Sequence, residues 1–172
     1  MFNKGDYIVY GTNGVCRVDD FMEVDEGDDS RVYYVLDPVR TQGSTIYSPV
    51  NNKRVLMRGI ISKDEAERLI AEAGQIETLK LVDSRAQEQQ YKDVLKGCDC
   101  EECLKLIKSI YKRIKEREAA GRKITAVDEK YMFLAKDSLF NELAIVLDMD
   151  VDELDETIMN EFEKSLSVAA TV

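Results

Sequence analysis

The sequence of 172 residues contains no histidine and no tryptophan. The lack of histidine removes the commonest general base, the usual activator of a nucleophile and the commonest nitrogen ligand of metals. The sequence also lacks the glycine-rich nucleotide-binding loops and the GxSxG motif of serine hydrolases. Among 34 Asp and Glu residues some carboxylates will lie close together by chance. We therefore expect the protein not to be an enzyme and to use no cofactor.

Long hydrophobic runs are also missing. No apolar run approaches the roughly 18 residues that would suggest a membrane-spanning helix. The N-terminus has no signal-peptide pattern. Because 44% of the residues are hydrophobic, the chain should nevertheless be globular. These features predict a soluble, cytoplasmic protein with no membrane partner and no small-molecule substrate.

The charge is acidic overall but unevenly distributed. The net charge of −10 argues against indiscriminate nucleic-acid binding. Much of the acidity lies in residues 146–172, which include eight acidic residues and one basic residue. Residues 105–123 are the opposite, with eight basic and two acidic residues. This segment is the only concentrated positive region of the sequence.

Residues 1–58 predict a small β-barrel. Turn signals at 5–6 and 11–14 separate β-rich runs. The runs cover residues 7–10, 15–24, 32–36 and 45–50, with a short fifth candidate at 54–57, and residues 25–30 are expected to form a loop. Pro49 cannot donate a hydrogen bond to a neighbouring strand, so its strand should lie at a sheet edge. A free edge can accept a strand from another protein.

The sequence resembles the CarD/CdnL family of bacterial RNA polymerase-binding regulators. The resemblance is carried by GD-x-IVY-G-x-NG-V near the start, by the YYVL and I-Y-S-P segments and by the helical remainder, and it spans residues 1 to about 147. The N-terminal module is similar to one in transcription-repair coupling factor. The resemblance implies an α+β protein in which a Tudor-like barrel, residues 1–60, precedes a helical domain, residues 61–172.

The resemblance also implies a partner for the predicted edge strand. The family segment that corresponds to Thr45, Ile46, Tyr47, Ser48 and Pro49 docks onto the β-subunit of RNA polymerase. Tyr47 stands where the family often has a basic residue, so the contact should be more apolar here, and an aromatic residue at its centre could be a hot spot. The alternative is an ordinary barrel strand with Ile46 or Tyr47 in the core.

The second part of the sequence predicts about five helices. Ser62 to Glu65 fits a capping box, and the helix that it begins should end near Ala73, with Gly74 in a left-handed conformation. The other helices are expected at 81–96, 100–118 with Asp99 as its cap, 125–147 and 151–166. Expected core positions include Val82 and Tyr91 in the second helix; Cys103, Leu104, Ile107 and Ile110 in the third; Tyr131 and Leu143 in the fourth; and Val151, Leu154, Ile158 and Phe162 in the fifth.

The basic segment and the resemblance together suggest contact with promoter DNA. Lys112 and Arg113 lie in the basic segment, and the resemblance adds Arg85 and Lys130. CarD-like proteins usually place a tryptophan before a basic pair in the second domain, where it wedges into the minor groove. The corresponding residues here, 82–86, contain no aromatic residue. We therefore expect weak phosphate contacts without a wedge.

Cys98, Cys100 and Cys103 form a C-x-C-x2-C motif. A closed zinc site needs a fourth ligand, from Cys16, a carboxylate or a second chain. The alternative is that the cysteines are reduced thiols at the start of a helix, and Cys103 also belongs to the apolar stripe of that helix. No metal is expected.

These observations predict a transcription regulator that binds the polymerase β-subunit through its barrel and modulates open-complex stability through its helical domain near the upstream fork of promoter DNA. The missing tryptophan and the acidic C-terminal helix leave open an adaptor that binds polymerase or another protein without touching DNA. A metal or thiol sensor that uses the three clustered cysteines is the third reading.

Overall fold

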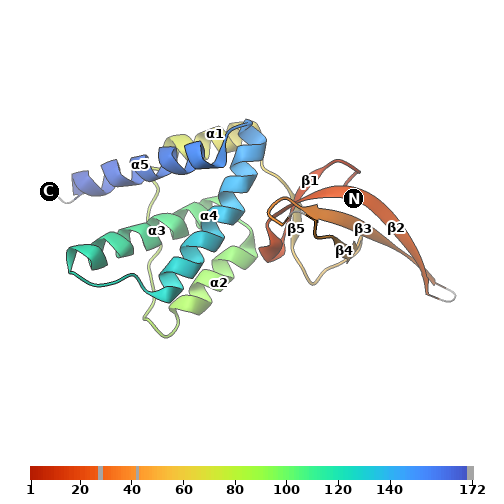
Figure 1. Ribbon diagram of the computed structural model, residues 1–172, viewed down its shortest axis with the longest axis horizontal. Helices are drawn as coiled ribbons and strands as arrows, with labels where there is room; N and C mark the ends of the chain where they lie inside the picture. The colour runs from red at the N-terminus through yellow and green to blue at the C-terminus, as the bar shows by residue number, and fades with distance from the viewer. Residues whose placement is uncertain (27–28, 42, 170–172) are drawn as a thin grey trace. The chain divides into compact units, whose positions relative to one another are not determined.

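The computed structural model describes residues 1–26, 29–41 and 43–169. The chain forms two compact units, Met1–Ile60 and Ile61–Val172. The first holds the strands and the second the helices, as Figure 1 shows, so the predicted α+β class is confirmed. No helix within the described residues is long and apolar enough to cross a membrane.

The first unit is one antiparallel sheet of five strands. These are β1 (Tyr7–Tyr10), β2 (Val15–Glu26), β3 (Asp29–Pro38), β4 (Ile46–Pro49) and β5 (Met57–Gly59), in the spatial order β4-β3-β2-β1-β5. A short 3-10 helix, η1 (Gly11–Asn13), links β1 to β2. In the described pairings β4 and β5 are the two end strands of the sheet.

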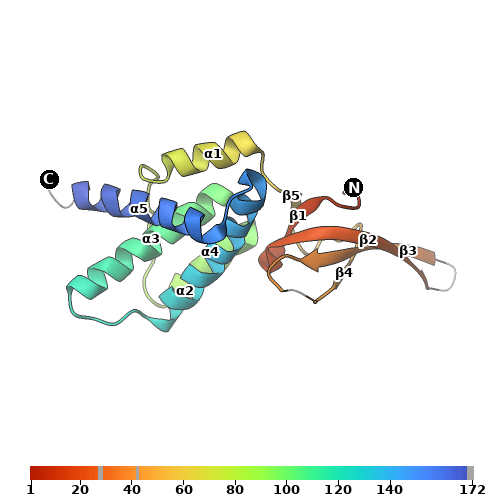
Figure 2. The ribbon, with the colours of Figure 1, turned by 45° about the horizontal axis from the view of Figure 1, so that its top comes forward.

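The strand boundaries differ in two places from those predicted. The loop expected at 25–30 is shorter, because β2 continues to Glu26 and β3 begins at Asp29; residues 27 and 28 lie outside the described residues. Figure 2 shows the resulting long hairpin, with β4 beside β3. The fifth strand covers Met57–Gly59 rather than 54–57. The sheet core consists of Ile8, Tyr10, Cys16, Val18, Tyr34 and Leu36.

The second unit contains five helices: α1 (Lys63–Glu72), α2 (Gln87–Gly97), α3 (Cys100–Ala119), α4 (Ala126–Leu147) and α5 (Val151–Ala169). Three of them begin with a side-chain cap, two of which, at Ser62 and Asp99, were predicted. Ser62 and Glu65 form a capping box, Asp99 accepts from the Glu102 amide, and Thr125 accepts from the Asp128 amide. α4 packs against each of the other four helices, and the core forms around it (Figure 1).

α2 begins six residues later than predicted. The Gln90 amide accepts from the Val82 N–H at 3.2 Å and donates to the Lys80 carbonyl at 3.0 Å. The Lys80 carbonyl and the Val82 N–H are therefore bonded to a side chain and not to backbone groups of a helix. Val82 is consequently 45% exposed, so its predicted place in the core was wrong.

The end of α1 is stabilised differently from the prediction. The helix stops before Gly74, but Gly74 is not among the residues with positive φ. A Cβ atom at this position would lie 3.3 Å from both the carbonyl oxygen and Oε2 of Glu161 in α5. The glycine therefore permits close approach of α5. Val151, also expected in the core, is 36% exposed, whereas Leu154, Ile158 and Phe162 are fully buried as predicted.

Candidate functional site

The edge strand β4 has one side that no described strand of the sheet covers. Its residues pair with β3 in the register Leu36↔Ile46 to Tyr33↔Pro49. The Val50 N–H donates to the Val32 carbonyl at 3.0 Å, and backbone groups alternate in direction along an antiparallel strand. Ile46 and Ser48 therefore face β3, while the N–H and C=O of Tyr47 face outward. Pro49 also falls on the outward side, where its lack of an N–H breaks no bond to β3.

The side chains of the predicted docking segment divide between the core and the surface. Tyr47 is 56% exposed, which agrees with its expected exposure. Ser48 is buried, and its hydroxyl accepts from the Asn52 side chain at 3.1 Å. Ile46 and Pro49 are half-buried, and Thr45, just before the strand, is exposed. The segment thus offers one aromatic ring beside one outward donor and acceptor.

The basic segment in α3 is mostly used within the protein. Lys105 lies 3.0 Å from Glu101 and 2.9 Å from Glu102, and these bonds raise the pKa of its ammonium group. Lys115 pairs with Glu163 of α5 at 3.3 Å. The charges of Lys105 and Lys115 are therefore partly neutralised by carboxylates of the protein itself.

Lys108 is buried and caps the chain that leaves α1. Its Nζ donates to the carbonyl of Gly74 at 2.7 Å and to that of Ile76 at 2.8 Å. A cation near the last carbonyls of a helix interacts favourably with the helix dipole. Burial lowers the pKa of Lys108, and the two carbonyls offset part of that cost.

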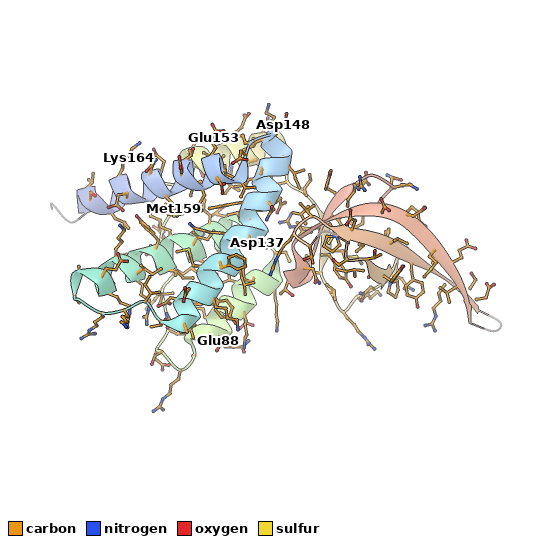
Figure 3. The ribbon with its side chains drawn as sticks, viewed as in Figure 1. Glu88, Asp137, Asp148, Glu153, Met159 and Lys164 are labelled. Carbon is orange, nitrogen blue, oxygen red and sulfur yellow. The ribbon has the colours of Figure 1, made fainter. Side chains whose placement is uncertain are left out.

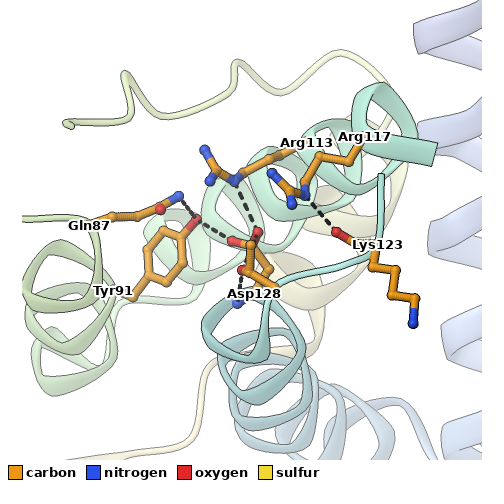
Figure 4. Close-up of polar contacts among 7 residues, drawn as sticks. Gln87, Tyr91, Arg113, Arg117, Lys123 and Asp128 are labelled. Atoms are coloured by element: carbon orange, nitrogen blue, oxygen red, sulfur yellow. Dashed lines mark hydrogen bonds and ion pairs between the residues drawn. The ribbon is translucent and has the colours of Figure 1, made fainter. Parts of the chain in front are cut away.

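A buried polar network joins α2, α3 and α4 at Asp128 (Figure 4). Its carboxylate accepts from Arg113 Nε at 2.9 Å, from the Thr125 hydroxyl at 2.7 Å and from the Tyr91 hydroxyl at 3.1 Å. Gln87 in turn donates to the Tyr91 hydroxyl at 2.6 Å. Burial and the Asp128 charge raise the pKa of Tyr91, which keeps it protonated as a donor.

This network changes the interpretation of Arg113 as a DNA ligand. Its Nε is occupied by Asp128, and its side chain is 29% exposed. In Figure 4 the terminal nitrogens point away from Asp128. Lys112, the next residue, is about half exposed and lies 4.0 Å from Glu116. Arg113 is first of all a structural residue, whereas Lys112 remains at the surface.

Arg85 and Lys130 lie near the ends where α2 and α4 begin. Arg85 is exposed, and no side-chain bond of it is found within the described residues. Lys130 is 57% exposed and pairs with Glu88 at 3.4 Å; Figure 3 labels Glu88 at this end of the helical unit. The pKa of Glu88 is lowered chiefly by the hydrogen bond from the Tyr131 hydroxyl, so the Glu88 carboxylate is ionised beside Lys130. The structure thus brings a free arginine and a paired lysine to one end of the bundle.

The backbone amides just before α2 already have an anionic partner. Asp83 Oδ1 accepts from the N–H of Arg85 at 3.0 Å and from that of Ala86 at 3.2 Å. Amides at a helix start are favourable places for a phosphate, and here a carboxylate of the chain itself occupies two of them. Any phosphate contact near Arg85 would therefore depend on side chains.

The cysteines do not form a metal cluster. Among the residues that the structure describes, no group of three or more His, Cys, Asp or Glu side chains is arranged to hold a metal ion. The Cys100 thiol donates to Glu142 Oε2 at 3.3 Å, and the Cys103 thiol donates to the Ala135 carbonyl at 3.5 Å. Burial raises the pKa of Cys103, and it raises that of Cys16 in the first unit to about 11.

Several buried polar residues that organise this unit were not identified from the sequence. Lys108 was counted only as part of the basic segment, and Asp128 only as a residue at the start of the fourth helix. Glu142, which accepts from the Ile61 N–H at 2.9 Å, gave no signal beyond its place in the fourth helix. The T-x-x-D spacing of Thr125 and Asp128 was the one available sign of a reciprocal cap.

The comparison with known families concerns the first unit. Residues 2–61 match the family model described as the CarD-like/TRCF RID domain. The unit that carries the open edge strand is thus a CarD-like domain, which confirms the assignment suggested by the sequence motifs. The match supports a transcription-related protein that interacts with RNA polymerase. A search of curated proteins found no match to the chain.

Proposed function

We propose that the protein regulates transcription by adding β4 to a strand of the RNA polymerase β-subunit. The observation that carries this proposal is the outward N–H and C=O of Tyr47 on an edge strand whose aromatic side chain is 56% exposed. Strand addition draws affinity from main-chain hydrogen bonds and specificity from side-chain contacts, and this segment offers both. We propose no catalytic step.

Three substitutions of Tyr47 separate the contributions of its ring and its backbone. Tyr47→Ala removes the ring and should weaken polymerase binding about 30-fold, the effect of losing an interface hot spot. Tyr47→Pro also removes the outward N–H and should cost a further factor of about five. Tyr47→Glu should abolish measurable binding by burying a charge. Surface plasmon resonance of the full chain on immobilised polymerase measures all three.

Tyr7→Glu is the matched control for these variants. Tyr7 is 36% exposed, and its strand β1 is paired on both sides. An exposed charge there should not weaken polymerase binding if strand addition occurs at β4. Equal losses at Tyr7 and Tyr47, or unchanged binding of Tyr47→Pro relative to Tyr47→Ala, would contradict docking at this edge.

We further propose that the helical unit modulates open-complex stability through phosphate contacts of Arg85 and Lys130. Such an effect needs only different affinities for the closed and open complexes, and about 1.4 kcal/mol changes their ratio tenfold. Exposed Arg85 and half-exposed Lys130 at one end of the bundle support the contact.

The alternative function is an adaptor that binds polymerase without touching DNA. It is favoured by the internal use of Lys105, Lys108 and Lys115 and by the carboxylate of Asp83 at the start of α2. The absence of tryptophan also removes the minor-groove wedge of CarD-like proteins.

The variant Arg85→Glu/Lys130→Glu distinguishes the two functions. If the helical unit contacts phosphates, reversing both charges should weaken binding of duplex promoter DNA and shorten the open-complex lifetime about tenfold, with polymerase binding intact. The control is Lys63→Glu/Arg68→Glu, which reverses two exposed charges on α1. An unchanged lifetime would support the adaptor. Arg113 is left unaltered, because a glutamate there would face buried Asp128.

A further inference from the structure

A shallow groove of about 530 Å³ runs beside α2 on the surface of the helical unit. Its walls come from the segment before α2, from α2 itself and from the start of α3: Val82, Ala86, Gln89, Gln90, Asp93, Val94, Gly97, Asp99 and Glu102. Arg85, the proposed phosphate ligand, lies in the same segment as Val82 and Ala86 but does not line the groove.

The groove follows α2 over nearly its whole length. Ala86, Gln89, Asp93 and Gly97 recur at intervals of three and four residues, so they lie along one face of the helix. This face is separate from the buried one that carries Gln87 and Tyr91. Eleven residues of helix span about 16 Å, the length of about three helical turns. An elongated partner of that length fits the groove better than a compact ligand.

The lining combines apolar and acidic side chains. Val82, Ala86 and Val94 supply apolar surface. The Val82 side chain is 45% exposed. Asp93, Asp99 and Glu102 supply three carboxylates; Glu102 is paired at 2.9 Å with Lys105, which does not line the groove, and Asp99 caps α3. Apolar anchors at helical spacing together with opposite charge are the features by which a groove recognises an amphipathic helix.

We propose that this groove binds a basic amphipathic helix of a partner protein. The three carboxylates would repel nucleic acid, and they would also repel α5 of a second copy, which is itself acidic. The proposal does not require polymerase contact through β4, so each can fail without the other.

The probe is a labelled synthetic helix of sixteen residues with leucines on one face and lysines on the other. Its matched counterpart carries glutamates in place of the lysines. Fluorescence anisotropy with the full chain should show at least tenfold tighter binding of the basic peptide, and amide NMR shifts should map to α2 and the start of α3. Equal affinity of the two peptides, or shifts elsewhere, would overturn the proposal.

Two variants of the chain test the groove itself. Asp93→Lys/Glu102→Lys should reduce the affinity for the basic peptide about tenfold, and Val82→Ser, at an exposed position, should reduce it several-fold. Glu153→Lys/Glu156→Lys makes the same change in net charge at exposed positions on α5 and should leave binding unchanged. An equal loss of affinity in this control would mean that the basic peptide is attracted by the net charge of the chain and not by the groove. If the free chain self-associates and Val82→Ser abolishes this self-association, the occupant of the groove would be a second copy of the chain. Either result would overturn the proposal.

Discussion

The variant Asp128→Ala is expected to lose about 3–5 kcal/mol of its free energy of unfolding, the cost of removing one partner from a buried ion pair. Asp128 is fully buried and accepts from Arg113, Thr125 and Tyr91. Without it, the buried hydroxyl of Tyr91 loses its acceptor, and the guanidinium group of Arg113 loses its counter-ion. The cap of α4 loses the bond from the Thr125 hydroxyl to the carboxylate and keeps the one from the N–H of residue 128 to that hydroxyl.

Urea unfolding of the full chain, followed by circular dichroism at the helical band, measures this loss. The control is Glu129→Ala at the next, exposed position of α4, which should change the free energy by less than about 0.5 kcal/mol. Asp128→Asn should fall between the two, because the amide retains one acceptor but has lost the charge. Stability of Asp128→Ala equal to that of the control would show that the network contributes nothing.

The variant Lys108→Met should lose about 2–3 kcal/mol, although methionine matches the aliphatic part of lysine. The ammonium group of Lys108 makes two charge-assisted bonds, to Gly74 and Ile76, and their removal leaves two carbonyls at the end of α1 without that donor. The apolar methionine offsets part of the loss, because burying the lysine charge is itself costly.

The effect of Lys108→Met should be local as well as global. Hydrogen exchange should quicken at residues 73–76, the segment that follows α1 and approaches Glu161 of α5. Lys112→Met is the control, since Lys112 lies one turn further along α3 and is about half exposed. If both variants are equally stable, Lys108 is no more than a tolerated buried cation.

The two lysines also show where reasoning from the sequence ends. Both lie in the same basic run, at positions 108 and 112, and nothing in the local pattern separates them. The structure buries Lys108 because the end of α1, more than 30 residues earlier, needs a donor there. Such a pairing depends on how helices cross, and residue spacing within one helix carries no information about it.

The edge position of β4, by contrast, could be predicted from the sequence, because the prediction rested on a residue within the strand itself. Pro49 cannot donate to a ladder, which favours an edge position for its strand, although Pro38 lies at the end of the inner strand β3. The structure places β4 at the end of the strand order, as expected. The exposure of Tyr47 also agreed with the prediction. Which backbone groups of β4 face outward, however, could be assigned only from the hydrogen bond between Val50 and Val32 in the structure.

By itself the sequence determined the α+β class, the caps at Ser62 and Asp99, and the edge position of β4. Each of these follows from the chemistry of a few neighbouring residues. Only the tertiary structure decided that Lys108 within the basic segment is buried, that Asp128 joins three helices and that apolar and acidic side chains line a groove beside α2. These features arise where distant segments meet, and the free energy of burying a charge depends on which partner the fold brings to it.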